Sequence, residues 1–229
     1  MPSLQEALPA IVRALAGRRP ASPPTGEARF EAVVAHFAAG GLASGRGDRL
    51  VAALDEAGML DPDALATAPL EEVVDALRDA RIEANPKLVC LILRVAAWYR
   101  AHREELEADP SEGGGLVDRA RDELGAINGV GRATADALAL HVFGVPTYPV
   151  DRATYRILVR HGWADPTADY DEASHLLVSA AESDPTLLAT LSRGLADVGK
   201  RFCKPSGPRC EPCPLRPVLP DGGPIEVDG

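Results

Sequence analysis

Three of the four cysteines are gathered in one short segment near the end of the chain. Cys203, Cys210 and Cys213 are separated by six and two residues, and Cys90 lies far before them. In a cytosolic protein, thiols at this spacing indicate a metal site rather than disulfides. Zinc would require a fourth ligand, and no histidine is near in the sequence. A redox pair would require a βαβ pattern, which is missing.

A glycine-rich turn is the second candidate site. Gly129 and Gly131 bracket Val130, and a helix is expected to begin at Arg132. Glycine lets the backbone turn sharply and approach a ligand without interference from a Cβ atom. The N–H groups at the start of a helix can then bind a DNA phosphate without reading sequence. A plain turn between helices is the alternative. The residues expected to contact DNA are Asn128, Gly129, Val130, Gly131, Arg132 and Thr134.

Helices are expected to position these residues. Aromatic residues make up only 4% of the chain, whereas Ala and Leu dominate. Because sheets prefer β-branched and aromatic residues, the composition predicts an all-α fold. Asp151 stands just before one expected helix, where its side chain can serve as an N-cap. Helical spacing of apolar residues marks a segment that begins at Phe30 and segments 4–16, 48–57, 69–80, 86–106, 116–126, 132–143, 152–161, 170–182 and 186–199.

The charge balance bears on the class of partner. A net charge of −10 argues against nucleic acid, since phosphate binding normally requires a basic surface. The segment from Ser192 to Arg216, however, contains six Lys or Arg residues and only two acidic residues, Asp197 and Glu211. A local basic surface can therefore exist on an acidic protein. The chain shows no long apolar run and no secretory signal at its start, so we expect a cytoplasmic, nucleoid-associated protein without a membrane partner.

Residues 124–156 resemble the endonuclease III-like, helix-hairpin-helix DNA glycosylases. The resemblance rests on the Gly-Val-Gly hairpin, Thr134-Ala135, Phe143-Gly144, Pro146-Thr147 and Val150-Asp151, and the cysteine segment extends it over roughly Phe30 to Leu215. It implies a monomer of two helical lobes flanking a DNA-binding cleft. One lobe would comprise residues 27–146, and the other residues 1–26 with 147–229. Asp151 and the hairpin would face that cleft, which receives a flipped nucleotide.

The resemblance also implies a reaction. Asp151 matches the family's catalytic aspartate, which supports the positive charge that forms on deoxyribose when a base leaves. Bifunctional members carry a nucleophilic lysine where this chain has Ala133, so a monofunctional glycosylase acting on damaged or mispaired duplex DNA is expected. Two alternatives stay open: a DNA-binding relative without catalysis, and a lyase that uses another amine. The base removed is equally open, among alkylated purines, oxidised pyrimidines and mismatched thymine or uracil.

For the cysteines, the resemblance implies a [4Fe–4S] cluster. Cys203, Cys210 and Cys213 match three of the family's four ligands, and the fourth position is Leu219. Asp221 is the expected replacement. Another metal, a partial cluster or a metal-free loop are the alternatives. The family's cluster holds a basic loop against DNA, and the corresponding residues are Lys200, Arg201, Lys204 and Arg209. The loop in which endonuclease III carries an inserting glutamine corresponds to Phe37–Ser44, which contains none.

Overall fold

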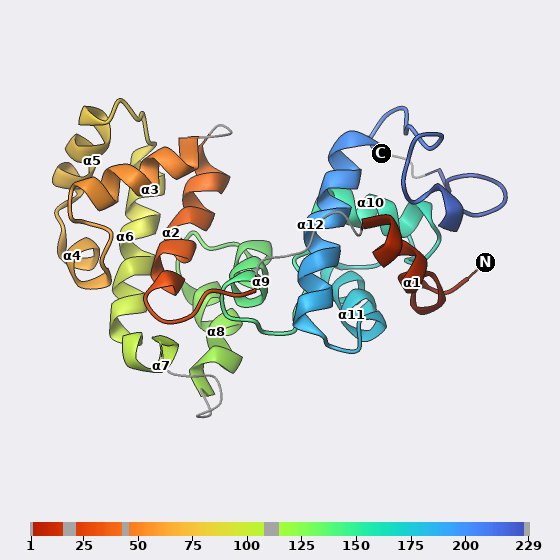
Figure 1. Ribbon diagram of the computed structural model, residues 1–229, viewed down its shortest axis with the longest axis horizontal. Helices are drawn as coiled ribbons and strands as arrows, with labels where there is room; N and C mark the ends of the chain where they lie inside the picture. The colour runs from red at the N-terminus through yellow and green to blue at the C-terminus, as the bar shows by residue number, and fades with distance from the viewer. Residues whose placement is uncertain (1, 16–21, 43–45, 108–114, 227–229) are drawn as a thin grey trace. The chain divides into compact units, whose positions relative to one another are not determined.

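The computed structural model describes residues 2–15, 22–42, 46–107 and 115–226, all of them helical or irregular (Figure 1). The expected all-α fold is confirmed, with twelve α-helices, one 3-10 helix and no strand among these residues. No helix in the described residues is long and apolar enough to cross a membrane. The chain divides into two compact units, Pro23–Phe143 and Met1–Ser22 with Gly144–Gly229. These are called the hairpin unit and the cysteine unit below.

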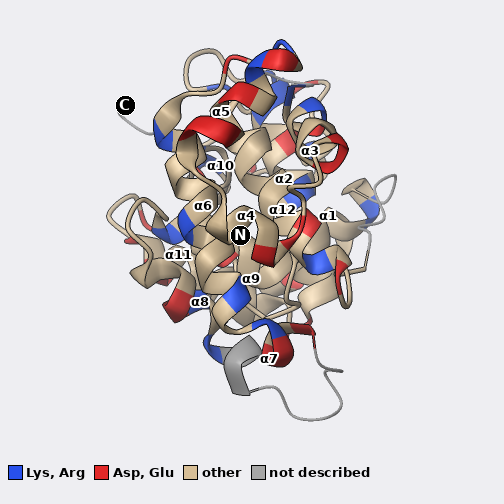
Figure 2. Ribbon diagram, turned by 90° about the vertical axis from the view of Figure 1, so that its left-hand side faces the viewer, with Lys and Arg blue, Asp and Glu red and all other residues tan. Residues whose placement is uncertain are grey.

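The hairpin unit is built around one long helix, α6 (Pro86–Ala101), which packs against α2, α4 and α5. Its core includes Phe30 and Tyr99, whose ring centroids are 5.0 Å apart. Acidic residues occupy part of α5, including Glu71 and Glu72 in its first turn (Figure 2). The remaining helices of this unit are α2 (Ala28–Gly41), α3 (Arg46–Glu56), α4 (Pro62–Thr67), α5 (Leu70–Asp79), α7 (Arg103–Glu107), α8 (Gly115–Ala126) and α9 (Arg132–His141).

The structure differs from the expected helices at two places in this unit. The expected helix 86–106 is broken at His102, so that α6 and α7 are separate. Nδ1 of His102 donates to the carbonyl of Trp98 at 2.9 Å, which is the carbonyl that a continuing helix would offer to the His102 N–H. The short helix α4 was not expected. Asp61 caps it, accepting from the N–H groups of Asp63 and Ala64, and Pro62 opens it.

The cysteine unit joins the N-terminal helix to the C-terminal part of the chain. The long helix α12 (Pro185–Arg201) packs against both α1 (Leu4–Leu15) and α10 (Arg152–Arg160), and α1 also contacts α11 (Tyr170–Ala180). Gly199 allows α12 to approach α10 closely, because a Cβ at this position would collide with Ala153. The cysteine segment follows α12 and leads into the 3-10 helix Arg216–Val218.

Candidate functional site

The turn between α8 and α9 depends on Gly129. Its φ of +98° lies in a region that side chains with a Cβ rarely adopt. Val130 is buried, and its N–H donates to the carbonyl of Ile127 at 2.9 Å, which closes the turn. An ion pair joins Arg121 of α8 to Asp136 of α9, whose side chain is fully buried. The two helices are therefore tied together on both sides of the turn.

Gly131 forms the N-cap of α9 and differs from Gly129. Its φ of −79° and ψ of 158° are open to any residue, and a Cβ there would meet nothing within 4 Å. Neither the backbone conformation nor packing explains a glycine at this position. No side chain caps α9, and its first turn contains no acidic residue. The helix start can therefore attract an anion, and the missing Cβ leaves room for a close approach.

The other residues expected at this turn lie on its surface. Asn128, Arg132 and Ala133 are exposed, and Thr134 is half-buried. The N–H of Thr134 donates to the carbonyl of Gly131 at 2.9 Å, which begins the regular bonding of α9. The methyl group of Ala133 thus stands on the exposed first turn of the helix, where it supplies no nucleophile.

Asp151 is the N-cap of α10. Its Oδ1 accepts a hydrogen bond from the N–H of Thr154 at 2.6 Å, and the side chain is exposed. A carboxylate has two oxygens, and Oδ2 makes no hydrogen bond within the described part of the chain. The helix therefore orients the carboxylate through one oxygen and leaves the other available.

Asp151 borders a surface hollow of about 390 Å³ in the cysteine unit. Two tyrosines and the arginines Arg152 and Arg156 also line it. The hydroxyl of Tyr170 accepts from the N–H of Val150 at 3.3 Å, and the hydroxyl of Tyr155 donates to the carbonyl of Pro166 at 2.7 Å. The two rings are held by these bonds beside the carboxylate. The hollow thus combines aromatic surface with one acid and two guanidinium groups. The rings can stack on a flat base, and the carboxylate can stabilise a developing positive charge.

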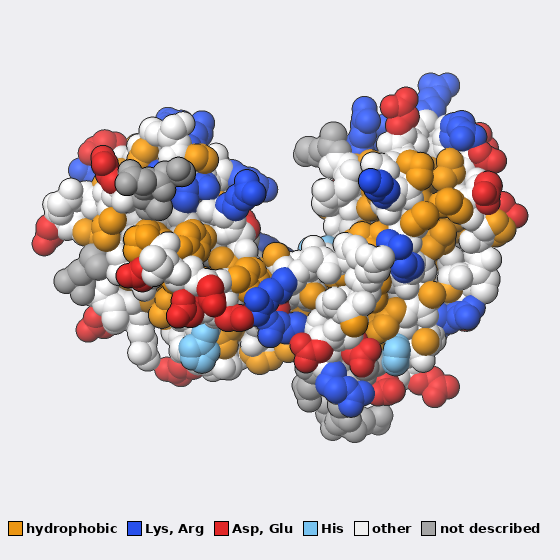
Figure 3. Space-filling model, turned by 180° about the vertical axis from the view of Figure 1, so that it is seen from behind, with side chains coloured by type: hydrophobic (Ala, Val, Ile, Leu, Met, Phe, Trp, Pro, Cys, Tyr) orange, Lys and Arg blue, Asp and Glu red, His pale blue; other side chains and the backbone are white. Residues whose placement is uncertain are grey.

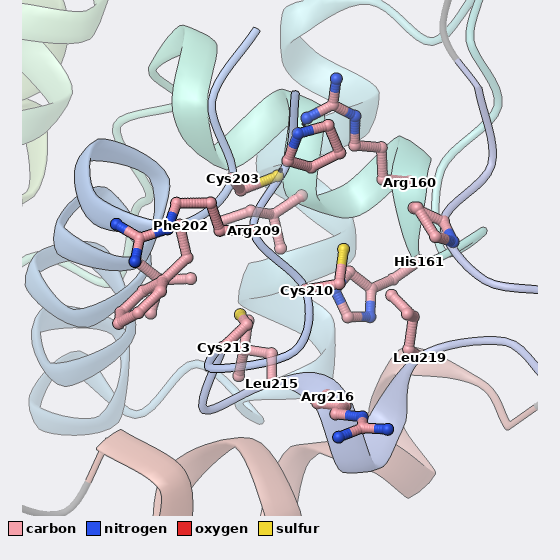
Figure 4. Close-up of a pocket in the computed structure, with 14 residues that line it drawn as sticks. Arg160, His161, Phe202, Cys203, Arg209, Cys210, Cys213, Leu215, Arg216 and Leu219 are labelled. Carbon is pink, nitrogen blue, oxygen red and sulfur yellow. Dashed lines mark hydrogen bonds between the residues drawn. The ribbon is translucent and has the colours of Figure 1, made fainter. Parts of the chain in front are cut away.

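The three clustered cysteines line one pocket (Figure 4). Cys203 is buried, and Cys210 and Cys213 are half-buried. Burial raises the pKa of the Cys213 thiol, and the nearby Cys203 and Cys210 raise it further, whereas hydrogen bonds from the backbone of Leu215 and Arg216 lower it. Three thiolates can share such a site only when cations offset their mutual repulsion.

Two arginines of α10 hold the start of the cysteine segment. Nη1 of the buried Arg160 lies 3.4 Å from the Cys203 Sγ and donates to the Lys204 carbonyl at 2.6 Å. Nη2 of Arg156 donates to the Cys203 carbonyl at 2.9 Å. The guanidinium groups thus fix the backbone around the first cysteine and place positive charge beside its sulfur.

The lining of this pocket corrects one sequence-based expectation. No histidine was expected near the cysteines, yet His161 lines the pocket beside them, as does Leu219. Burial lowers the pKa of His161, which favours the neutral imidazole. Sequence spacing could not reveal this residue, because α10 precedes the cysteine segment by some forty residues. Asp221 is exposed and lies outside the lining, and Cys90 belongs to the hairpin unit.

The donor atoms around this pocket bear on which metal group it could hold. Among the described residues, no three His, Cys, Asp or Glu side chains are arranged to hold a metal ion. The four ligands of one zinc ion must all lie about 2.0–2.3 Å from it. In an iron–sulfur cluster each ligand binds a different iron, so the ligands stand farther apart. Three cysteine thiols and one imidazole line the common pocket, and both are donor types known in iron–sulfur centres.

The basic residues expected around the cysteines are all exposed: Lys200, Arg201, Lys204 and Arg209. Arg201 is partly engaged, since its Nη1 lies 3.4 Å from Asp197 Oδ2 and its guanidinium stands over the Phe202 ring at 5.3 Å. The N–H of Arg209 donates to the carbonyl of Phe202 at 2.9 Å, which folds the segment back on the end of α12. Lys and Arg side chains are visible on the surface of this unit, at the left of Figure 3.

Comparison with known proteins shows which proteins this chain is similar to. No protein-family model matches the chain. Endonuclease III of Bacillus subtilis is 34% identical over 112 residues, covering 48% of this chain and 49% of that protein. Endonuclease III of Thermotoga maritima is 34% identical over 138 residues, covering 58% of this chain and 63% of that protein. A solved non-covalent complex of endonuclease III with DNA shares the fold, with a TM-score of 0.64, 21% identity, and coverage of 94% of this chain and 93% of that chain.

These similarities support an assignment to the endonuclease III-like, helix-hairpin-helix DNA glycosylase superfamily. The sequence matches span about half to two thirds of the length of these relatives. Ala133, expected from the resemblance at the position of the lysine, and Leu219, expected at that of the fourth cysteine, both lie in the described residues. The segment expected to form the loop of the inserting glutamine, Phe37–Ser44, is largely helical, since residues 37–41 end α2; residues 43 and 44 lie outside the described residues.

Proposed function

We propose that this protein is a monofunctional DNA glycosylase that hydrolyses the N-glycosidic bond of a damaged or mispaired base in duplex DNA. It would act as a monomer in the cytoplasm. One observation carries the proposal. An exposed carboxylate, Asp151, is oriented through a single oxygen beside an aromatic hollow. Ala133, which the sequence resemblance aligns with the nucleophilic lysine, carries only a methyl group.

The chemistry assigned to Asp151 follows from its charge. As the bond between C1′ and the base breaks, its electron pair leaves with the base, and positive charge develops on the sugar. The carboxylate stabilises that charge, and water then adds to C1′ and releases a proton. Thr154 supports this role because its N–H fixes the carboxylate through Oδ1. Without an amine to form a Schiff base, the sugar–phosphate backbone stays intact.

The hairpin would bind the DNA backbone. Gly131 leaves room at the start of α9, and the uncapped helix start directs its dipole outward. Asn128, Arg132 and Thr134 lie close by in the sequence and can add polar contacts to the same strand. Such contacts fix the position of the enzyme on DNA without selecting a base sequence.

The cofactor proposed is a [4Fe–4S] cluster held by Cys203, Cys210 and Cys213. When bound, the cluster would cross-link the segment after α12 and offset the charge of its thiolates. Arg156 and Arg160 hold the backbone of that segment. The exposed Lys200, Arg201, Lys204 and Arg209 would then present positive charge to phosphates.

A panel of oligonucleotide duplexes tests the function. Each duplex carries one alkylated purine, oxidised pyrimidine, or thymine or uracil mismatch, and products are separated with and without alkali treatment. We expect one class of duplex to break only after alkali, and borohydride to trap no covalent complex. Release of no base from the whole panel, with retained affinity for damaged DNA, would refute a glycosylase. Efficient borohydride trapping would refute the monofunctional assignment.

A further inference from the structure

The pocket lined by the three clustered cysteines also contains a fourth side chain that can bind a metal, an imidazole. We propose that His161, through Nε2, is the fourth protein ligand of the cluster held by Cys203, Cys210 and Cys213. It takes the place that the superfamily gives to a cysteine at position 219. This inference rests on the cluster in the proposed function, but not on the glycosylase reaction.

Position and burial single out His161. It follows α10 directly, and only 5% of its surface is exposed. Its imidazole is turned into the pocket, beside Cys210 and near Leu219 (Figure 4). The leucine side chain cannot bind iron, so the protein lacks a fourth thiolate there. The imidazole stands on the same side of the pocket as the missing ligand.

A hydrogen bond sets the protonation of the ring. Nδ1 of His161 lies 3.2 Å from the carbonyl oxygen of Val218, the residue before Leu219. A carbonyl only accepts hydrogen bonds, so Nδ1 must carry the proton. In the neutral ring, Nε2 then holds a free electron pair. A histidine that binds a metal through one nitrogen commonly donates the other N–H to a backbone carbonyl or a carboxylate.

The ring is also fixed in orientation. It stacks on Trp163, with centroids 4.6 Å apart and an angle of 21° between the planes. Stacking on one side and the Val218 bond on the edge leave the imidazole little freedom to rotate. A ligand held in this way loses little conformational entropy when it binds a metal.

The chemistry of the pocket favours imidazole over carboxylate. Among the described residues, no Asp or Glu lines the pocket, and Asp221 is exposed to solvent. Three thiolates already bring negative charge into a partly buried site, and a neutral fourth ligand adds none. Histidine is an established ligand of iron in iron–sulfur centres, where it replaces cysteine and raises the reduction potential.

Iron analysis and pulsed EPR of the full chain test the proposal. Protein labelled with ¹⁵N-histidine is purified anaerobically, and iron and sulfide are measured before the cluster is reduced. We expect about four iron atoms per chain and a ¹⁵N hyperfine coupling to the reduced cluster. His161→Ala should abolish the coupling and shift the cluster to a three-iron form. His175→Ala is the matched control, since this histidine is exposed on α11, and it should change neither signal.

Two further variants keep the test decisive if His161→Ala folds poorly. His161→Ala combined with Leu219→Cys should restore four irons without the nitrogen coupling, because a thiolate then fills the open position. Asp221→Ala should behave as wild type. Absence of ¹⁵N coupling in the wild type, or loss of iron in Asp221→Ala alone, would overturn the assignment. If the purified protein contains no iron, both the His161 assignment and the cluster are refuted. The panel of damaged duplexes tests the glycosylase activity independently.

Discussion

The Oδ1 atom of Asp151 accepts a hydrogen bond from the N–H of Thr154 at 2.6 Å, so the proposed catalytic carboxylate is also the N-cap of α10. These two roles make different demands on the side chain. A cap needs an oxygen that accepts a hydrogen bond, which Asn supplies as well as Asp. Stabilising a positively charged sugar needs the full negative charge.

Asp151→Asn should therefore lower the rate of base release at least about a hundredfold while leaving the melting temperature unchanged. Single-turnover kinetics and thermal denaturation measure the two effects. Asp184→Asn is the matched control, since Asp184 caps α12 in the same unit through the N–H groups of Thr186 and Leu187. It should leave base release unchanged. Undiminished turnover in Asp151→Asn would reduce Asp151 to a structural cap.

Ala133→Lys should introduce a nucleophile at the exposed start of α9. We expect borohydride to trap a covalent complex between this variant and a suitable duplex, because a lysine amine can form a Schiff base with the opened sugar. Stability should fall by less than about 1 kcal/mol, the cost of a cation at a helix N-terminus. Ala126→Lys adds the same charge at the exposed end of α8 and should trap nothing. Equal trapping by both variants would contradict the assignment of position 133.

The two glycines of the hairpin should respond differently to alanine. Gly129→Ala should destabilise the protein by about 1–2 kcal/mol, since an L-residue at this positive φ is strained. Its Cβ would also lie 3.3 Å from Arg94 Nη2 and Leu91 Cδ1. Gly131→Ala has neither problem, so its stability should match the wild type. Chemical denaturation of both variants checks this contrast.

DNA binding by Gly131→Ala should nevertheless weaken about tenfold or more, the effect of losing one hydrogen bond to a charged phosphate. The loss should be the same for duplexes of different sequence, because phosphate contacts carry no direct sequence information. Fluorescence anisotropy with several duplexes measures it. A folded variant with unchanged affinity would show that the hairpin does not contact phosphate.

Lys204→Ala should reduce the salt dependence of DNA binding. Each phosphate contact contributes about 0.9 to the slope of log K against log salt, so the slope should fall by about that amount. Lys87→Ala is the control, since Lys87 is also exposed but lies on α6 of the hairpin unit. An identical slope in both variants and the wild type would exclude the cysteine segment from the DNA interface.

The sequence by itself determined the features that depend on local spacing. Apolar residues at helical intervals predicted the helical class, which is confirmed. The glycines around Val130 indicated a tight turn between two helices, and the structure has one between α8 and α9. Asp151 before a helical segment indicated an N-cap, which the Thr154 bond confirms. Each of these depends on hydrogen bonds and side-chain positions within a few residues, so nearby sequence suffices to specify it.

A side chain that competes for a backbone carbonyl ends the long expected helix early. The segment 86–106 has helical periodicity throughout, but the imidazole of His102 takes the Trp98 carbonyl and separates α6 from α7. Periodicity records which face of a helix is apolar, and it does not report a side chain that competes for a backbone carbonyl.

Only the tertiary structure brought His161 to the cysteines. The two are far apart in sequence, and the nearer Asp221 was the natural candidate for a fourth ligand. Gly199 of α12 packs closely against Ala153 at the start of α10, and Arg160 at the end of α10 donates to the carbonyl of Lys204 in the segment that follows α12. Helix packing decides which residues distant in the chain come into contact. A glycine or alanine in the sequence indicates that two helices can pack closely, but it does not indicate which residues then meet at the ends of those helices.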